Sequence, residues 1–212
     1  MEHLIPAATG TFLALFPITD PIGAVPIFHS LTVDIAPHRR GRLARRVSIN
    51  VIVVLAIALV LGRFVLDFFG ISLGVLQIAG GLLLARTAWM MISASETSKQ
   101  SQRVSESLQD DITLIPLAIP LISGPGAIGM VIGLAAKSTH PAGYAGALLG
   151  ILGLGLLLYL FLTLGGPLVK LLGQRGLRAF TQVLGFLILA ISIQLMSEGI
   201  FFLINDFSGN IV

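Results

Sequence analysis

The stretch Phe16–Phe28, FPITDPIGAVPIF, places an aspartate between prolines in a sequence that is otherwise almost entirely apolar. A carboxylate is costly in an apolar environment unless it has a partner or a function. Proline removes a backbone donor and interrupts a helix. We therefore expect a helix break here, with Asp20 as the N-cap and Pro21 as the first residue of a second half-helix.

A related pattern, PLISGPGAI, occupies Pro120–Ile128. It predicts a second break, after which a half-helix begins near Pro125 with Ser123 or Gly124 as its cap. The N-terminus of a helix carries unpaired N–H groups and a partial positive charge, which favour an anion such as a carboxylate. Glycines at both breaks would let a small ligand approach the backbone. The predicted solute site consists of Thr19, Asp20, Pro21, Gly23, Ser123, Gly124 and Gly126.

Three interpretations of Asp20 are open from the sequence. The carboxylate caps its helix, or it pairs with a substrate ammonium or a coupling cation, or it takes up and releases a proton during transport. A zwitterion would suit the site, because its carboxylate would meet the helix ends and its ammonium would meet Asp20.

Other kinds of chemistry lack the residues that they need. The chain has no cysteine, and its four histidines are scattered without metal-ligand spacing, so we expect no metal site. It contains no G-x-S-x-G, no H-E-x-x-H, no ATP-binding loop and no second buried acid near Asp20. We therefore expect neither an enzyme nor a bound cofactor.

The elements that would position these residues are membrane helices. Of the 212 residues, 55% are hydrophobic and 11% are charged, whereas a soluble domain has about 25% charged residues. Each of six apolar stretches has the roughly 20 residues that a membrane helix needs, and none alternates as a barrel strand would. The stretches are Leu4–Leu31, Val47–Leu66, Ile71–Ile92, Ile112–Ala135, Tyr144–Leu164 and Phe180–Ile204. The expected fold is all-α, with six transmembrane helices of which the first and fourth are broken near the midplane.

The basic residues predict an orientation for these helices. Ten of the thirteen Lys and Arg residues fall in the loops after the first, third and fifth spans, and five of them lie within 39–46. The positive-inside rule places these loops in the cytoplasm and both termini outside it. Beside a membrane span, such a run contacts anionic lipid rather than nucleic acid.

Two pairs of segments indicate an internal repeat. Pro17–Val25 resembles Pro120–Ile128 at an offset of 103 residues, and Gln77–Ala85 resembles Gln182–Ala190 at an offset of 105. A unit of three spans ends on the opposite side of the membrane, so its copy must be inverted, as in many secondary transporters. We predict one transmembrane domain, with repeat one at about 4–92, a cytoplasmic linker at about 93–111 and repeat two at about 112–204.

Four further polar residues lie within predicted spans. Gln77 and Gln182 hold matching repeat positions, where they either hydrogen-bond between helices or line a cavity. Arg86 is within reach of the cytoplasmic surface, and Glu198 is near the outer end of the last span. The GALLG pattern at Gly146–Gly150 predicts a close helix contact.

The sequence resembles the MarC family in DPIGAVPIF (Asp20–Phe28), PLAIPLISGPGAI (Pro116–Ile128) and DDI (Asp110–Ile112). The resemblance implies a six-span protein of the bacterial-type inner membrane with inverted repeats and discontinuous first and fourth helices. It also implies export or exchange of glycine, alanine or related amino acids. Two positions depart from the family pattern, because Ala24 replaces a frequent asparagine and Arg86 stands where an apolar residue is expected.

The sequence thus predicts a secondary active transporter of a small neutral, zwitterionic amino acid, coupled to a proton or sodium gradient. The alternatives are a passive channel for a small polar solute and a non-transporting membrane protein. Aquaporin-like channels also use six spans and inverted repeats, but the chain contains no Asn-Pro-Ala tripeptide. The oligomeric state is left open.

Overall fold

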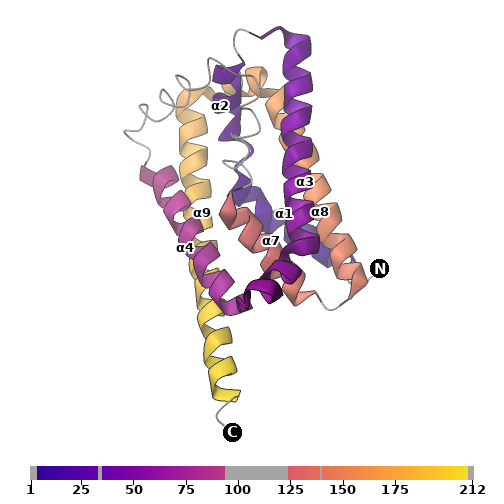
Figure 1. Ribbon diagram of the computed structural model, residues 1–212. Coiled ribbons are helices and arrows are strands. Elements are labelled where there is room, and N and C mark those ends of the chain that lie inside the picture. Colours follow the sequence, from indigo (N-terminus) through magenta and orange to yellow (C-terminus); the bar gives the residue numbers. More distant parts are fainter. Residues whose placement is uncertain (1–3, 33–34, 94–123, 139, 210–212) are drawn as a thin grey trace.

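The computed structural model describes residues 4–32, 35–93, 124–138 and 140–209, and every regular element within these ranges is an α-helix (Figure 1). The helices are α1 (Leu4–Thr19), α2 (Ala24–Leu31), α3 (Pro37–Phe69), α4 (Leu73–Ser93), α7 (Pro125–Lys137), α8 (Pro141–Thr163) and α9 (Gly165–Gly209). The linker and the predicted first half of the fourth span, including Ser123, lie outside the described residues.

Four helical segments are long and apolar enough to cross a membrane. These segments are His38–Phe69, Leu73–Ser93, Pro141–Thr163 and Arg175–Asp206. Two further apolar helices are shorter, Leu4–Thr19 and Gly126–Ala136. The prediction of an all-helical membrane protein is therefore confirmed, and the two short helices belong to the spans that were expected to be broken.

The first span is broken, although not at the predicted residues. Helix α1 continues past Pro17 to Thr19, a turn follows, and α2 begins at Ala24 rather than at Pro21. The chain leaves the right-handed helical region at Asp20, whose φ is 38°. This left-handed conformation is uncommon outside glycine but is tolerated by aspartate, so it fixes where the break falls.

Helix α3 begins earlier than the sequence predicted. The basic run at 39–46 was expected to form a loop, but it is helical from Pro37 onward, and four of its arginines are exposed. Arginine is a good helix former and proline is favoured at the first helical position, so the membrane helix simply extends into water. Helix α3 ends at Gly70, where a φ of 64° and a hydrogen bond from Ile71 N to Leu66 O (2.9 Å) close the last turn.

Glycines bring the helices close together. The predicted contact through GALLG is confirmed, because a Cβ added to Gly150 of α8 would lie 2.6 Å from Ala8 O of α1. On α9, a Cβ added to Gly199 would lie 2.6 Å from Gly74 O of α4. Helices α4 and α9 run antiparallel along their contact (Figure 1).

Helix α9 contains a kink. Gly173 has φ 63° and ψ 169°, a conformation that is essentially confined to glycine, and it separates a short first segment from the long membrane segment. The predicted sixth span, Phe180–Ile204, lies entirely after this kink.

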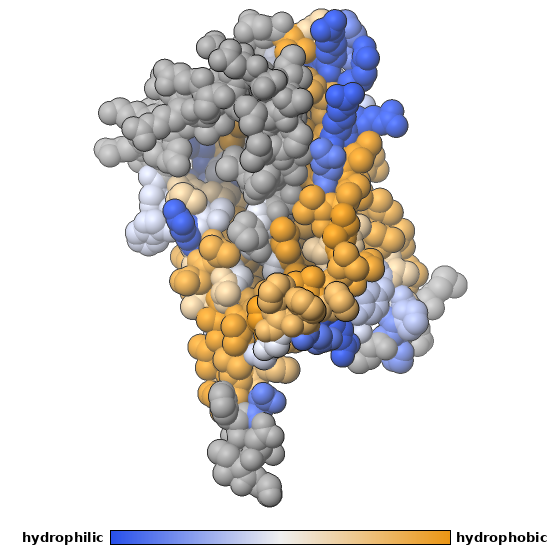
Figure 2. Space-filling model, in the orientation of Figure 1, coloured by the Kyte–Doolittle hydropathy of each residue, from blue (hydrophilic) through white to orange (hydrophobic). Residues whose placement is uncertain are grey.

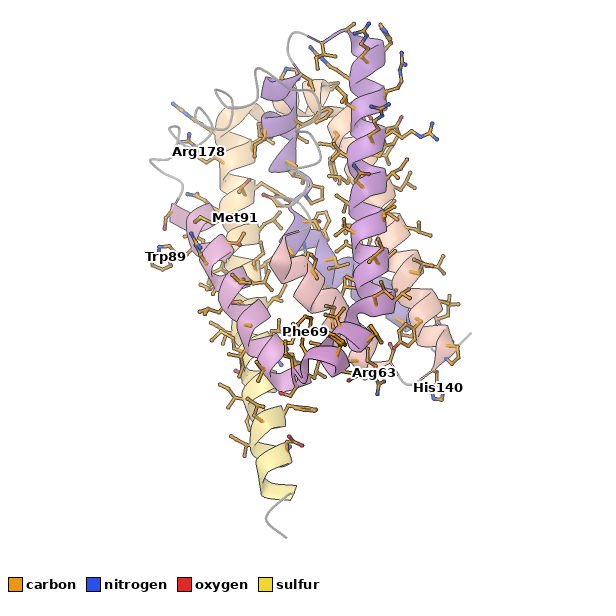
Figure 3. The ribbon with its side chains drawn as sticks, in the orientation of Figure 1. Arg63, Phe69, Trp89, Met91, His140 and Arg178 are labelled. Carbon is orange, nitrogen blue, oxygen red and sulfur yellow. The ribbon has the colours of Figure 1, made fainter. Side chains whose placement is uncertain are left out.

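The outer surface matches a lipid environment. Figure 2 shows apolar residues covering the middle of the bundle, with hydrophilic residues gathered where α3 begins. Large apolar side chains such as Val60, Leu156 and Phe186 are exposed on this surface. Arg63 and His140 lie at the end of the bundle opposite to Arg178 (Figure 3). Exposed apolar area of this extent on a soluble protein would mark an interaction surface, and here it faces lipid.

Candidate functional site at the break between α1 and α2

The Asp20 carboxylate closes the turn that precedes α2, whereas the N-cap of α2 itself is Gly23, and no side chain within the described ranges caps that helix. The Asp20 Oδ1 accepts a hydrogen bond from Gly23 N at 2.9 Å, and the main-chain O of Asp20 accepts one from Ala24 N at 3.0 Å. A side-chain bond to the amide three residues later has the form of an N-cap bond, but here it lies within the turn before α2. The prediction of Asp20 as the N-cap residue is therefore wrong by three positions, because a turn stands between Asp20 and α2, although the carboxylate does hold that turn.

Gly23 allows this carboxylate to fold over the turn. A Cβ added at position 23 would overlap Asp20 Oδ2 and would lie 2.6 Å from its Cγ. Glycine is therefore required here by the close approach of the carboxylate rather than by its own backbone angles, which are right-handed helical.

The hydrogen bond from Gly23 N uses only one of the two carboxylate oxygens. Asp20 is half-buried, and within the described part of the chain the bond from Gly23 N is the only hydrogen bond to its side chain and no cation pairs with it. The sixteen residues of α1 precede it and α2 follows it, so it lies well inside the apolar span. An ionisable group without a charged partner at such a depth is a functional-site hypothesis by default.

Thr19 and Pro21, which flank Asp20, are held in the packing. Thr19 is 4% exposed, and its hydroxyl donates to Leu15 O at 3.1 Å within α1. The Pro21 side chain is fully buried. Both residues thus fix the position of the break, and the donor of Thr19 is already used by its own helix.

The start of α7 also follows the predicted pattern. Gly124 is the N-cap, with φ −55° and ψ 169°, and Pro125 occupies the first turn. Gly124 O accepts hydrogen bonds from Ala127 N (2.9 Å) and Ile128 N (3.2 Å), and no side chain of the described residues caps this helix. The helix therefore presents an N-terminus to which a ligand group could bind.

Helix α1, which ends at the first break, packs against α7, which begins after the predicted second one. Leu15 of α1 and Ala127 of α7 belong to one buried cluster, and Ile18 contacts that cluster as well as a second one between α4 and α9. In Figure 1 the break after α1 and the start of α7 lie at a similar height, and α2 and α7 run from there to opposite ends of the bundle.

Gly126 has a different neighbour from the one that the sequence suggested. A Cβ added at this position would overlap the side chain of Leu84 on α4, with Leu84 Cγ at 2.8 Å. The absence of a side chain at Gly126 therefore allows α7 to pack closely on α4. Hydropathy and proline spacing carry no information about this partner.

This contact predicts that Gly126→Ala lowers the melting temperature of the purified protein. The extra methyl group forces Leu84 to move, and overpacking of this kind costs about 1–3 kcal/mol. Leu84→Ala removes the obstacle, so the double variant should be more stable than the sum of the two single effects predicts. Strict additivity would contradict the packing role of Gly126.

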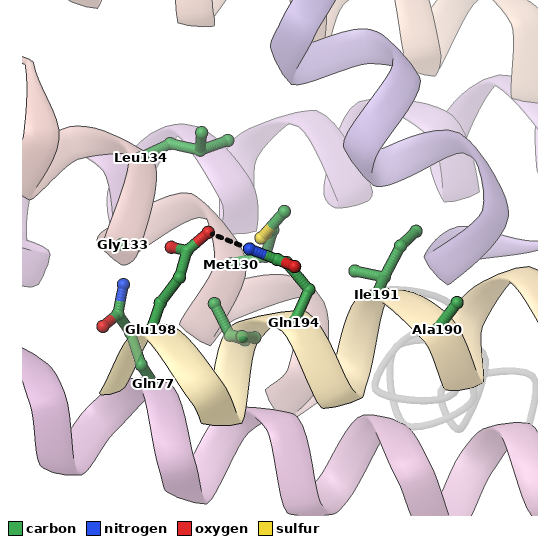
Figure 4. Close-up of a pocket in the computed structure, with 9 residues that line it drawn as sticks. Gln77, Met130, Gly133, Leu134, Ala190, Ile191, Gln194 and Glu198 are labelled. Carbon is green, nitrogen blue, oxygen red and sulfur yellow. Dashed lines mark hydrogen bonds between the residues drawn. The ribbon is translucent and has the colours of Figure 1, made fainter. Parts of the chain in front are cut away.

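A pocket of about 470 Å³ lies elsewhere, between α4, α7 and α9 (Figure 4). It contains polar side chains from Gln77, Gln194 and Glu198, and Gln194 Nε2 donates to Glu198 Oε1 at 3.0 Å. The sequence had identified two of these residues separately and had missed Gln194. The four-residue spacing of Gln194 and Glu198, which places both on one face of a helix, was the signal available. Within the described residues, no group of His, Asp or Glu side chains could hold a metal ion.

Comparison with known proteins gives a consistent result. The sequence matches the family described as MarC family integral membrane protein over residues 5–204. It is similar to a UPF0056 membrane protein of Pyrococcus abyssi (36% identity, 89% of this chain and 92% of the relative). It is also similar to the UPF0056 membrane proteins YvbG of Bacillus subtilis (31% identity, 89% and 92%) and YhcE of Escherichia coli (32% identity, 89% and 89%). The comparison with solved structures found no match. The family match covers nearly the whole chain and includes both proline-containing motifs, Asp20–Phe28 and Pro116–Ile128. The chain therefore belongs to the MarC family of integral membrane proteins.

Proposed function

We propose that the protein is a secondary active transporter of a small neutral amino acid such as glycine or alanine. The observation that carries the proposal is the Asp20 carboxylate, which lies at a helix break inside an apolar span without a cationic partner among the described residues. Broken helices that meet near the midplane form the solute and ion sites of many secondary transporters.

The geometry suggests how a zwitterion would be held. Asp20 already accepts the Gly23 N–H of the turn before α2, so the uncapped N-terminus of α7 is the better place for the substrate carboxylate. The free lone pairs of Asp20 would then accept hydrogen bonds from the substrate ammonium. A proton or a sodium ion at Asp20 would couple the solute to a gradient.

An inverted repeat is part of this proposal and is supported by the contact between α4 and α9. A Cβ on Gly81 would lie 2.5 Å from Met196 Cγ, and a Cβ on Gly185 would lie 2.9 Å from Met91 Cβ. Met196 lies 105 residues after Met91, which is the offset of the predicted repeat. Gly185 lies within one residue of the position that the same offset gives for Gly81. Such an exchange of partners is what a two-fold axis between two related helices would produce.

The orientation is proposed from the charges. The exposed arginines at the start of α3 would lie in the cytoplasm of a bacterial-type inner membrane, in contact with anionic lipid, and both termini would lie outside. Arg63, at the opposite end of α3, would then lie on the outer side.

Flux of labelled glycine and alanine into proteoliposomes, under imposed proton and sodium gradients, tests the proposal. We expect saturable uptake that one gradient drives and that unlabelled solute on the far side accelerates by counterflow. Flux that is linear in concentration and shows no counterflow would instead indicate a passive channel. No flux of either amino acid under any gradient would contradict the proposed substrate class.

A further inference from the structure

The pocket between α4, α7 and α9 has a simple structural origin. Helices α4 and α7 touch where Gly80 meets Gly129, since a Cβ on Gly129 would lie 3.6 Å from Gly80 Cα. One turn further along each helix, at Gln77 and Gly133, the helices separate and the pocket opens. A Cβ added to Gly133 would have no neighbouring heavy atom within 4 Å, so this position borders empty space.

The pocket contains an amide that lacks a partner in the described part of the chain. Gln77 is 2% exposed and lines the pocket, yet no hydrogen bond joins its side chain to any described residue. Figure 4 shows its amide directed towards the side of the pocket that holds Glu198. The polar atoms of Gln77 are not among the fully buried, unpartnered ones, so they keep accessible surface beside the pocket, where water or a solute can hydrogen-bond to them.

The other walls indicate the character of the occupant. Met130, Leu134 and Leu195 provide apolar contacts, whereas Gln194 and Glu198 add polar atoms on the α9 side. A volume of about 470 Å³ falls within the range of small-molecule sites and greatly exceeds the cage of a single ion. A few polar groups set in apolar walls are typical of a site that binds a small organic solute.

We propose that this pocket is a second binding site, reached by water, for a small solute that offers both a hydrogen-bond donor and a hydrogen-bond acceptor. The Gln77 amide satisfies one group of each kind, because its N–H donates and its carbonyl accepts. Zwitterionic amino acids and uncharged small amides share this chemistry. Asp20 does not line this pocket, and the inference does not depend on the proposed transport cycle.

The natural absence of cysteine allows a direct test with single-cysteine variants of the full chain in proteoliposomes. Gly133→Cys places a thiol in the pocket. Gly10→Cys on α1 is the matched control, because an added Cβ there also meets nothing within 4 Å and Gly10 does not line the pocket. A hydrophilic, membrane-impermeant methanethiosulfonate is added on both sides. We expect the pocket thiol to react at least roughly tenfold faster, because the reactive thiolate forms where water reaches it.

Solute binding is then measured as protection of the Gly133→Cys thiol by alanine and by propionamide in separate titrations. Adding Gln77→Leu should raise the half-protecting concentration by at least roughly 3- to 10-fold, the worth of one of the two hydrogen bonds that the amide would make. Gln182→Leu is the control, because Gln182 holds the corresponding repeat position but donates to Ile92 O (3.4 Å) and does not line the pocket. It should leave protection unchanged.

Each outcome decides the inference. Protection by alanine alone or by propionamide alone supports it and identifies the ligand as zwitterionic or uncharged. Rapid modification that neither compound slows would show a pocket that holds only water, and it would overturn the inference. Modification as slow as that of Gly10→Cys would show that the pocket is covered, and it would also overturn the inference. In that case, a disulfide between two Ala190→Cys copies would identify a second copy of the chain as the cover. Where Gln77→Leu does not fold, Gly133→Leu with Ala190→Cys as the reporter should abolish protection, and retained protection would contradict the site.

Discussion

Asp20→Asn is expected to reduce flux of glycine and alanine by roughly 10- to 100-fold, because hydrogen bonds to a charged group contribute about 1.5–3 kcal/mol. Asparagine keeps a side-chain oxygen that can accept the bond from Gly23 N, which measures 2.9 Å with aspartate. It also tolerates the left-handed conformation at position 20, where φ is 38°. The substitution therefore removes the charge and preserves the hydrogen bond from Gly23 N. Flux in proteoliposomes, normalised to folded protein, measures the effect.

Asp20→Ala separates the two roles of the carboxylate. Alanine loses both the hydrogen bond from Gly23 N and the charge, and loss of one such bond costs about 1 kcal/mol, so this variant should melt at a lower temperature as well as fail to transport. The asparagine variant should melt close to the parent protein. If Asp20→Asn leaves substrate binding and ion coupling unchanged, the carboxylate only holds the turn and the transport site lies elsewhere.

Gly150→Leu is expected to have the largest effect on stability. Even the first carbon of a side chain at this position would lie 2.6 Å from Ala8 O and 2.9 Å from Thr11 Cβ, so α1 and α8 would have to separate. Overpacking typically costs about 1–3 kcal/mol, and here the obstacle is backbone that a rotamer change does not move. We expect little folded protein after extraction and a markedly lower melting temperature for what remains.

Gly153 provides the matched control on the same helix. A Cβ added there would lie 3.6 Å from the Phe12 ring, which is ordinary van der Waals contact. Gly153→Ala should therefore be tolerated, and Gly150→Ala should already destabilise the protein. Equal melting temperatures for these two alanine variants would show that α1 and α8 approach each other less closely than the structure indicates.

Much of the architecture follows from properties that are local along the chain. Long apolar runs predict membrane helices because the backbone must satisfy its own hydrogen bonds in lipid. The prolines around Asp20 and at Pro125 predict breaks because proline removes a donor and fixes its own φ. The Asp20 carboxylate and the helix start at Pro125, from which the candidate site is built, were predicted in this way. The start of α3 was misplaced, since a charged run is compatible with either a loop or an extended helix.

The partners across helices were decided by tertiary structure alone. Gly126 was expected to face a solute but packs on Leu84, and Gln77 shares a pocket with Gln194 more than a hundred residues away. Hydropathy and spacing describe one helix at a time, whereas these contacts depend on how two helices are rotated and aligned against each other. The sequence by itself determined the class of protein, the presence of a break in the first span and the charge at that break. Only the packing of separate helices decided which glycines hold the bundle together and where a pocket opens.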